Sequence, residues 1–149
     1  MTTAHVFTFA SIDGKDLPLK SFAGKAVLIV NTASECGYTP QYAGLQKLWQ
    51  ERRGDGLVVL GVPSNDFGAQ EPGSEQAIRQ FCTARFQVDF PMTVKQTVIG
   101  GKAHPFYRWI AEELGEGAAL ATAGSRRSSP GPAARRTCRA CWHRSPRSP

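Results

Sequence analysis

Residues 26–40 read AVLIVNTASECGYTP, and they carry both the main fold signal and the main chemical signal of the chain. The stretch opens with an apolar run rich in β-branched residues, a pattern typical of a strand that is buried on both faces of a parallel sheet. A second run of this kind, LVVLGVP, occupies 57–63. Between them, Thr39 as N-cap and Pro40 at the first helical position predict a helix, which Gly54 ends. Strand, helix and strand form a βαβ unit and predict an α/β fold.

Further elements flank this unit. The Asp-Gly pair at 13–14 lies between Val6–Ser11 and Asp16–Lys20 and predicts an N-terminal β-hairpin. A second helix is expected to begin with Ser74 as N-cap, and a third to run from His104 or Pro105 to Leu114. The residues predicted to face the core are Tyr42, Leu45, Leu48 and Trp49 on the first helix and Ile78, Phe81 and Cys82 on the second.

Length and composition favour one globular domain: the chain has 149 residues and 41% hydrophobic content. Its longest apolar runs are too short to span a bilayer, and the first residues show no secretory signal. We therefore expect no membrane association and a cytoplasmic, reducing location. In such a setting, four cysteines indicate redox chemistry or metal binding more than a disulfide scaffold.

The positive charge is confined to the C-terminal part of the chain. Residues 118–149 contain seven arginines and no carboxylate, whereas 1–117 hold eleven basic and twelve acidic residues. The segment from 121 onward has no Val, Ile, Phe, Tyr or Met, so it lacks the apolar surface that would offset the entropy of ordering it. We expect a domain at 1–117 and a disordered tail rich in Arg, Pro and Ser at 118–149.

Cys36 lies in the predicted loop between the first parallel strand and the following helix. Ligands of open α/β sheets collect beyond the carboxyl ends of the strands. Unpaired N–H groups and the helix dipole favour an anion there, including a thiolate, which is the nucleophilic form of cysteine. Cys36 is therefore a candidate nucleophile, and the alternative is a spectator thiol in an exposed loop.

The chain resembles the glutathione peroxidase family, in its cysteine-containing form, in four segments that follow in the family's order. They are NTASECGYTPQY at 31–42, VPSNDFGAQEPGSEQAI at 62–78, FCTARFQVDFPM at 81–92 and AHPFYRWIAEEL at 103–114. The resemblance covers roughly residues 6–117. It implies a thioredoxin-like fold, an oxidoreductase that reduces hydrogen peroxide and organic hydroperoxides, and a role in the response to oxidative stress.

The resemblance also implies roles for two cysteines. Cys36 falls on the peroxidatic position, where peroxide would oxidise the thiolate to a sulfenic acid. Cys82 occupies the position of the resolving cysteine in the thioredoxin-dependent members, although its place on a helical apolar stripe also suits a core residue. Thioredoxin or glutathione would be the reducing co-substrate, and we expect no bound cofactor and no metal.

The chain departs from the family pattern near the expected thiol site. Asp66 stands where the family usually has a glutamine, and an ionised carboxylate cannot donate a hydrogen bond to a thiolate. Asp66 would then be protonated or turned away, or Gln70 or Asn65 would supply the donor. Asp66 as an ordinary loop acid that caps a turn is the alternative.

A second departure lies in the C-terminal part of the chain. The family has a Trp-Asn pair, a further strand and a closing helix after the third helix, and no such pattern follows Gly117. The C-terminal strands and helix of the fold are therefore missing from the sequence pattern. We hypothesise a divergent or frameshifted C-terminus from about residue 118.

The tail leaves other interpretations open. Its arginines could bind nucleic acid phosphates, which makes a non-catalytic thioredoxin-like protein with a basic tail an alternative function, as is an inactive truncated peroxidase. Cys138, Cys141 and His143 offer zinc-type ligands, but a single CxxC is a weak metal signal. We expect neither nucleic acid nor metal binding to be the main role.

Overall fold

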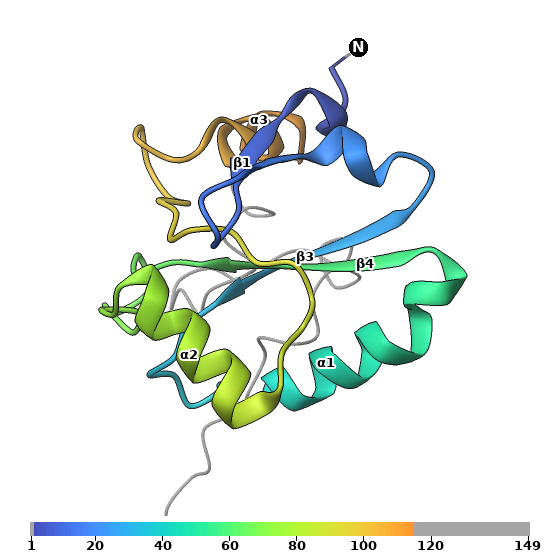
Figure 1. Ribbon diagram of the computed structural model, residues 1–149. Helices are drawn as coiled ribbons and strands as arrows, with labels where there is room; N and C mark the ends of the chain where they lie inside the picture. The colour runs from blue at the N-terminus through green and yellow to red at the C-terminus, as the bar shows by residue number, and fades with distance from the viewer. Residues whose placement is uncertain (1, 115–149) are drawn as a thin grey trace, which may run out of the picture.

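The computed structural model describes residues 2–114 (Figure 1). The predictions made for 118–149 lie outside the described residues. In chain order the elements are the 3-10 turn η1 (Ala4–Val6), β1 (Thr8–Ala10), β2 (Asp16–Pro18), η2 (Leu19–Phe22), β3 (Ala26–Thr32), α1 (Gln41–Arg52), η3 (Arg53–Asp55), β4 (Leu57–Pro63), α2 (Glu75–Phe86) and α3 (Pro105–Leu114).

The centre of the fold is the parallel pair of β3 and β4, which have the predicted bounds. Ala26 lies opposite Leu57, and the register continues without a bulge to Thr32 opposite Pro63. Helix α1 connects the two strands, so the predicted βαβ unit is confirmed. The carboxyl ends of both strands lie at the same edge, which places the loops after Thr32 and Pro63 side by side.

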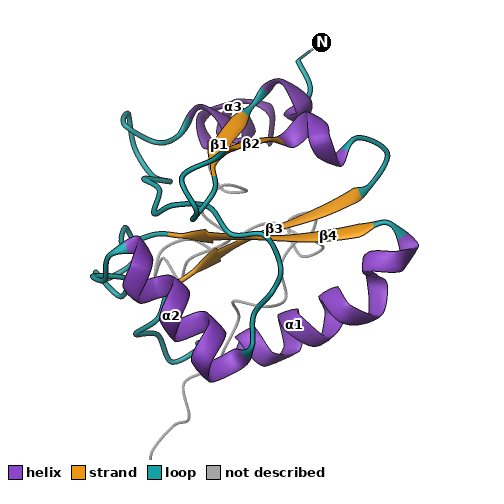
Figure 2. Cartoon of the chain, viewed as in Figure 1, coloured by secondary structure: helices purple, strands orange, loops and turns teal. Residues whose placement is uncertain are grey.

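Alternate side chains of β4 belong to two different cores. Leu60 and Val62 pack with residues of α3 and the N-terminal segment, whereas Val59 packs with residues of α1 and α2. Figures 1 and 2 show the same arrangement, with α1 and α2 on one side of the strand pair and α3 with β1 and β2 on the other. The period of two along a strand therefore builds a three-layer fold.

The segment at 91–94 joins the hairpin to the central strands. Gly61 exchanges backbone hydrogen bonds with Pro91 and Thr93, while the N–H of Val94 donates to the carbonyl of Ala10. A side chain at Gly61 would meet the Phe90 ring at 3.1 Å. A larger residue at this position would therefore have to displace the Phe90 ring by a few tenths of an ångström.

The hairpin, α2 and α3 agree with the sequence predictions in kind and in order. β1 and β2 are antiparallel, but each is shorter than predicted because a 3-10 turn precedes β1 and another follows β2. Ser74 caps α2 by accepting from the N–H of Ala77. Within residues 2–114, none of the helices is both long enough and apolar enough to cross a bilayer.

The predicted ends of α1 are wrong. The helix begins at Gln41 with Pro40 in the N-cap position, and Thr39 does not cap it, because the Thr39 side chain bonds into the preceding loop instead. At the other end the helix stops at Arg52, not at Gly54. The 3-10 turn η3 follows and is capped by Gly56, whose positive φ of 88° suits glycine.

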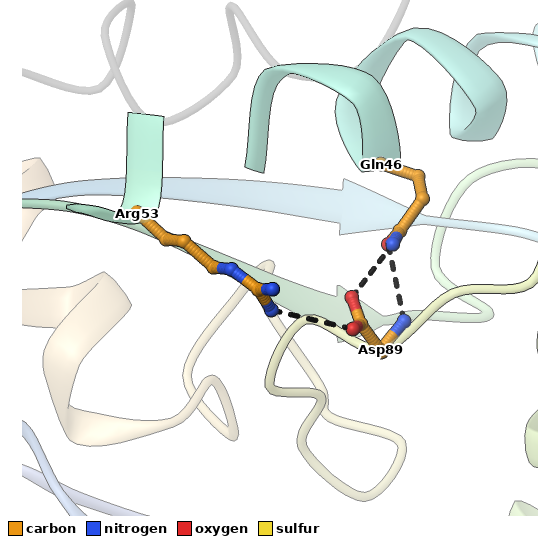
Figure 3. A network of polar contacts seen from close by, with 3 residues as sticks. All are labelled: Gln46, Arg53 and Asp89. Atoms are coloured by element: carbon orange, nitrogen blue, oxygen red, sulfur yellow. Dashed lines mark hydrogen bonds and ion pairs between the residues drawn. The ribbon is translucent and has the colours of Figure 1, made fainter. Parts of the chain in front are cut away.

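A polar side chain that the sequence analysis did not assign to the core lies on the buried face of α1. Gln46 is buried, and its amide forms two hydrogen bonds with Asp89, in the segment after α2: Nε2 donates to Oδ1 at 2.6 Å, and Oε1 accepts from the Asp89 N–H at 3.0 Å. Arg53 approaches the second carboxylate oxygen at 3.5 Å (Figure 3). These contacts fix the end of α2 against α1.

Candidate functional site

The loop at 33–40 holds Cys36 beyond the carboxyl end of β3, as predicted. Buried Thr39 organises it: the N–H of Cys36 donates to Thr39 Oγ1 at 3.0 Å, and the Thr39 hydroxyl lies 3.1 Å from the carbonyl of Ala33. The N–H of Thr39 also donates to the carbonyl of Cys36. The loop that carries the candidate nucleophile is therefore fixed by hydrogen bonds from its backbone to the buried Thr39 side chain.

The Cys36 thiol is partly exposed, and within residues 2–114 it forms no disulfide. The backbone N–H of Tyr38 donates to Sγ at 3.4 Å. This contact directs a backbone donor at the sulfur just before the N-terminus of α1, where the sequence predicts the nucleophile. Partial exposure also leaves the sulfur accessible to a small oxidant.

The loop after β4, at 64–74, lies beside the Cys36 loop. The N–H of Glu35 donates to the carbonyl of Gln70 at 3.0 Å, which places the Gln70 backbone next to Cys36. Asn65 Oδ1 accepts from the backbone N–H of Glu71 at 2.9 Å, so the oxygen of the Asn65 side chain is already hydrogen-bonded. The adjacent strand ends thus bring Gln70 and Asn65 near the site, and a donor role for either amide stays a prediction.

Asp66 makes a different set of contacts. Its Oδ2 accepts from the N–H of Val98 at 2.6 Å and from the N–H of Ile99 at 3.2 Å. The carboxylate thus binds the backbone of the turn at 98–99. These bonds match the alternative in which Asp66 caps a turn. They also direct the carboxylate, which stands at the usual glutamine position of the family, toward residues 98–99.

Cys82 is buried on α2, where its thiol lies beside the Tyr42 hydroxyl of α1. Burial raises the pKa of the Cys82 thiol to about 11, and the nearby Glu71 carboxyl acts in the same direction while the Tyr42 contact opposes it. The thiol is therefore protonated at neutral pH. Both the core role and the resolving role predicted for Cys82 are compatible with this placement.

The sequence reading missed Glu71, whose side chain is completely buried beside the Cys36 loop. It also missed Thr32, Ser34 and Tyr42 as polar groups, although each has a buried oxygen in this region. The only sequence signal for Glu71 was its position next to Gln70, in the loop that follows a buried strand. Loop acids are usually exposed, so that signal did not single out Glu71.

His104 has a structural role. His104 lies at the start of α3, as predicted, where Nδ1 accepts from the N–H of Phe106 and Nε2 bonds to the carbonyl of Thr8. Among residues 2–114, no group of three or more His, Cys, Asp or Glu side chains is arranged to hold a metal ion. The motif at Cys138, Cys141 and His143 is outside that part of the chain.

The family comparison agrees with this geometry. The model of the glutathione peroxidase family matches residues 4–111. The chain belongs to the glutathione peroxidase family. The match ends within α3, so it includes both Cys36 and Cys82.

Similar proteins and structures come from several lineages. The glutathione peroxidase-like peroxiredoxin GPX5 of Chlamydomonas reinhardtii is 48% identical over 103 residues, covering 69% of this chain and 64% of that protein. The hydroperoxy fatty acid reductase gpx1 of Synechocystis is 46% identical over 108 residues, covering 72% and 64%. This chain thus matches slightly less than two thirds of the length of these curated relatives.

Solved structures of the family have the same fold. The crystal structure of Trgpx in apo form has a TM-score of 0.58 and 36% identity, covering 75% of this chain and 65% of that chain. The crystal structure of T. cruzi GPX1 also has a TM-score of 0.58, at 33% identity, covering 76% and 67%. The thioredoxin-like fold expected from the resemblance is confirmed.

Proposed function

We propose that the chain is a thiol peroxidase in which Cys36 reduces hydroperoxides. One observation carries the proposal: in a chain of the glutathione peroxidase family, a partly exposed Cys36 thiol accepts a backbone N–H at the carboxyl end of a central strand. A nucleophilic thiolate with an open approach is what peroxide chemistry requires.

The chemistry begins with attack by the Cys36 thiolate on the terminal oxygen of a hydroperoxide. The S–O bond forms as the O–O bond breaks, and the alkoxide leaves and takes up a proton to become an alcohol. Cys36 becomes a sulfenic acid, so sulfur is oxidised by two electrons and the peroxide is reduced. The N–H of Tyr38, which donates to Sγ, would stabilise the charge on sulfur before attack.

We assign the resolving role to Cys82, the second cysteine in the described part of the chain. Its thiol would attack the Cys36 sulfenic acid, forming a disulfide and releasing water. The two Cα atoms must come within about 7 Å for this bond. Because Cys82 is buried on α2, part of that helix would have to unwind.

The reductant and the substrate are further parts of this proposal. The relative from Chlamydomonas is named a peroxiredoxin and the relative from Synechocystis a hydroperoxy fatty acid reductase. By analogy, we propose thioredoxin in preference to glutathione as reductant, and organic hydroperoxides as well as hydrogen peroxide as substrates. A reducing compartment such as the cytoplasm would suit this cycle.

The test is brief peroxide treatment in the presence of dimedone, followed by mass spectrometry. Cys36 should be the first thiol labelled, and Cys36→Ser should abolish peroxide turnover. Preferential labelling of Cys138 or Cys141 would refute the proposal, as would full turnover by the serine variant.

The resolving step is tested separately with Cys82→Ser. We expect the wild-type chain to form a Cys36–Cys82 disulfide that thioredoxin reduces faster than glutathione does. The variant should instead accumulate sulfenic acid or overoxidise. Unchanged thioredoxin-dependent turnover in the variant would remove Cys82 from the mechanism while leaving the role of Cys36 intact.

A further inference from the structure

Glu71 is a buried acid in a position where an ordinary loop residue would be exposed. Its side chain has 0% exposure, and neither carboxyl oxygen has a hydrogen bond of normal geometry within the part of the chain that the structure describes. Its backbone is fixed, since the N–H donates to Asn65 Oδ1 at 2.9 Å. A buried carboxyl group without regular partners is costly and calls for an explanation.

The carboxyl group belongs to a set of buried polar groups around Cys82 and Ser34. The hydroxyl oxygens of Thr32, Ser34 and Tyr42 are also buried and, within residues 2–114, also lack regular hydrogen bonds. We define the buried polar cluster by its members, which are Thr32, Ser34, Tyr42, Glu71 and Cys82.

Contacts connect this cluster to both ends of the proposed reaction. On one side the Glu71 carboxyl lies against the backbone and the side chain of Ser34, two residues before Cys36. On the other side the Tyr42 hydroxyl lies against the Cys82 thiol, close enough to Glu71 for its carboxyl to influence both groups. The cluster therefore reaches from the Cys36 loop to α2.

Burial favours the neutral form of Glu71. Burial raises the pKa of Glu71 above its ordinary value of 4.5, and the exposed carboxylate of Glu35 acts in the same direction. The contact with Ser34 and the more distant Lys95 oppose this shift. Tyr42 and Cys82, which face Glu71 from α1 and α2, both have raised pKa values and are neutral at pH 7.

The resolving step has a proton to move. As Cys82 attacks, its S–H bond breaks, the S–S bond forms, and hydroxide departs from the Cys36 sulfenic acid. The thiol proton and the hydroxide together give water, but the thiol is buried and hydroxide is a poor leaving group. A group that takes the first proton and returns one to the hydroxide would assist both events.

We propose that Glu71 carries this proton in the step that joins Cys36 and Cys82. One carboxyl oxygen receives the proton of the Cys82 thiol, and the carboxyl gives its own proton toward the hydroxide, with the Ser34 hydroxyl on the path. Glu71 ends the step in the protonation state in which it began. This inference rests on the proposed peroxidase function and on Cys82 as the resolving thiol.

The test compares Glu71→Gln with Glu35→Gln in the full chain. Both variants lose one carboxyl group near Cys36, but Glu35 is exposed and serves as the matched control. After one equivalent of peroxide, samples are alkylated at intervals, and mass spectrometry follows the sulfenic acid and the disulfide separately. We expect Glu71→Gln to form sulfenic acid at close to the wild-type rate and the disulfide about a hundredfold more slowly. Glu35→Gln should match the wild type in both steps.

The pH profile distinguishes proton transfer from a structural role. Without Glu71, the Cys82 thiolate must form by titration with solvent, so the disulfide rate of the Gln variant should rise steeply with pH in the alkaline range, because burial keeps the pKa of the Cys82 thiol raised. The wild-type rate should be much flatter, and Glu71→Asp should recover part of it at neutral pH. Infrared difference spectra should also show a protonated carboxyl at neutral pH that Glu71→Gln removes.

The outcomes separate this inference from the proposed function. If the wild-type Cys36 forms no sulfenic acid, the peroxidase proposal fails and the inference fails with it. If sulfenic acid forms but Glu71→Gln makes the disulfide at the wild-type rate and with the wild-type pH profile, only the role of Glu71 is refuted. A deficit that is equal at every pH, or an Asp variant no better than Gln, would also refute proton transfer.

Discussion

Thr39 shows how a single hydroxyl positions the nucleophile. It accepts from the N–H of Cys36 and contacts the carbonyls of Ala33 and Ser34, so one buried side chain fixes both sides of the loop. Thr39→Val keeps the shape and removes these bonds, and it leaves partly buried backbone groups without these partners. We expect a loss of about 1–3 kcal/mol in the free energy of unfolding and slower oxidation of Cys36.

Urea unfolding and the rate of sulfenic acid formation measure the two effects of this change. Thr39→Ser is the control, because it keeps the hydroxyl and should stay close to the wild type. Equal peroxide reactivity in the Val variant and the wild type would show that the loop holds Cys36 without Thr39.

At the scale of the elements, His104 makes the start of α3 sensitive to acid. Burial lowers the pKa of His104 below its ordinary value of 6.5; nearby Arg108 acts in the same direction, and the bond to the Thr8 carbonyl opposes it. The ring is neutral with Nε2 as the donor to Thr8, because Nδ1 accepts from the N–H of Phe106. Protonation would remove that acceptor.

The sign of the pH effect follows from the lowered pKa of His104. Its contribution to stability is present above pH 6.5 and is lost as the pH falls through the lower pKa of the folded state. We predict that the free energy of unfolding falls below pH 6.5, and that the fall is smaller in His104→Asn. Urea titrations over this range measure it, and parallel pH profiles for the two proteins would contradict the assignment.

The contact between α1 and the segment after α2 depends on Asp89. Asp89→Ala leaves the buried Nε2 of Gln46 without its partner at 2.6 Å, which should cost about 1–3 kcal/mol of unfolding free energy. Arg53→Ala is the control, because the ion pair at 3.5 Å is exposed and should contribute less than about 1 kcal/mol. Thermal or urea unfolding measures both variants. Equal losses of unfolding free energy in the two would show that the Gln46–Asp89 hydrogen bonds stabilise the fold no more than the exposed ion pair does.

At the scale of the whole molecule, the open question is how the chain continues after α3. The family pattern calls for a Trp-Asn pair that opens a further strand, and residues 118–149 contain none. We predict that one of the other two reading frames from about codon 118 encodes such a segment, followed by apolar residues. The nucleotide sequence tests this directly. If neither frame contains it, the arginine-rich segment is the chain's own.

If the frame prediction holds, expression of the repaired chain is the functional companion. Peroxide turnover by the repaired chain should then exceed that of the present chain. Comparing the rate of Cys36 oxidation in the two chains would also show whether residues 2–114 are sufficient for that step.

The sequence alone determined the elements whose signals are local. The apolar runs at 26–32 and 57–63 have strand bounds that match the structure, and Ser74 caps α2, because both patterns depend only on neighbouring residues. The place of Cys36 after the first of these strands followed for the same reason.

Only the tertiary structure decided which polar groups are buried and what they contact. Thr39 fits the sequence rule for an N-cap, yet its hydroxyl bonds to the Cys36 loop because the chain folds back there. Gln46 is buried against Asp89, which lies 43 residues further along the chain. Glu71 is buried against Ser34, which belongs to the Cys36 loop. Burial and pKa shifts arise from contacts between segments distant in sequence, and no local pattern encodes them.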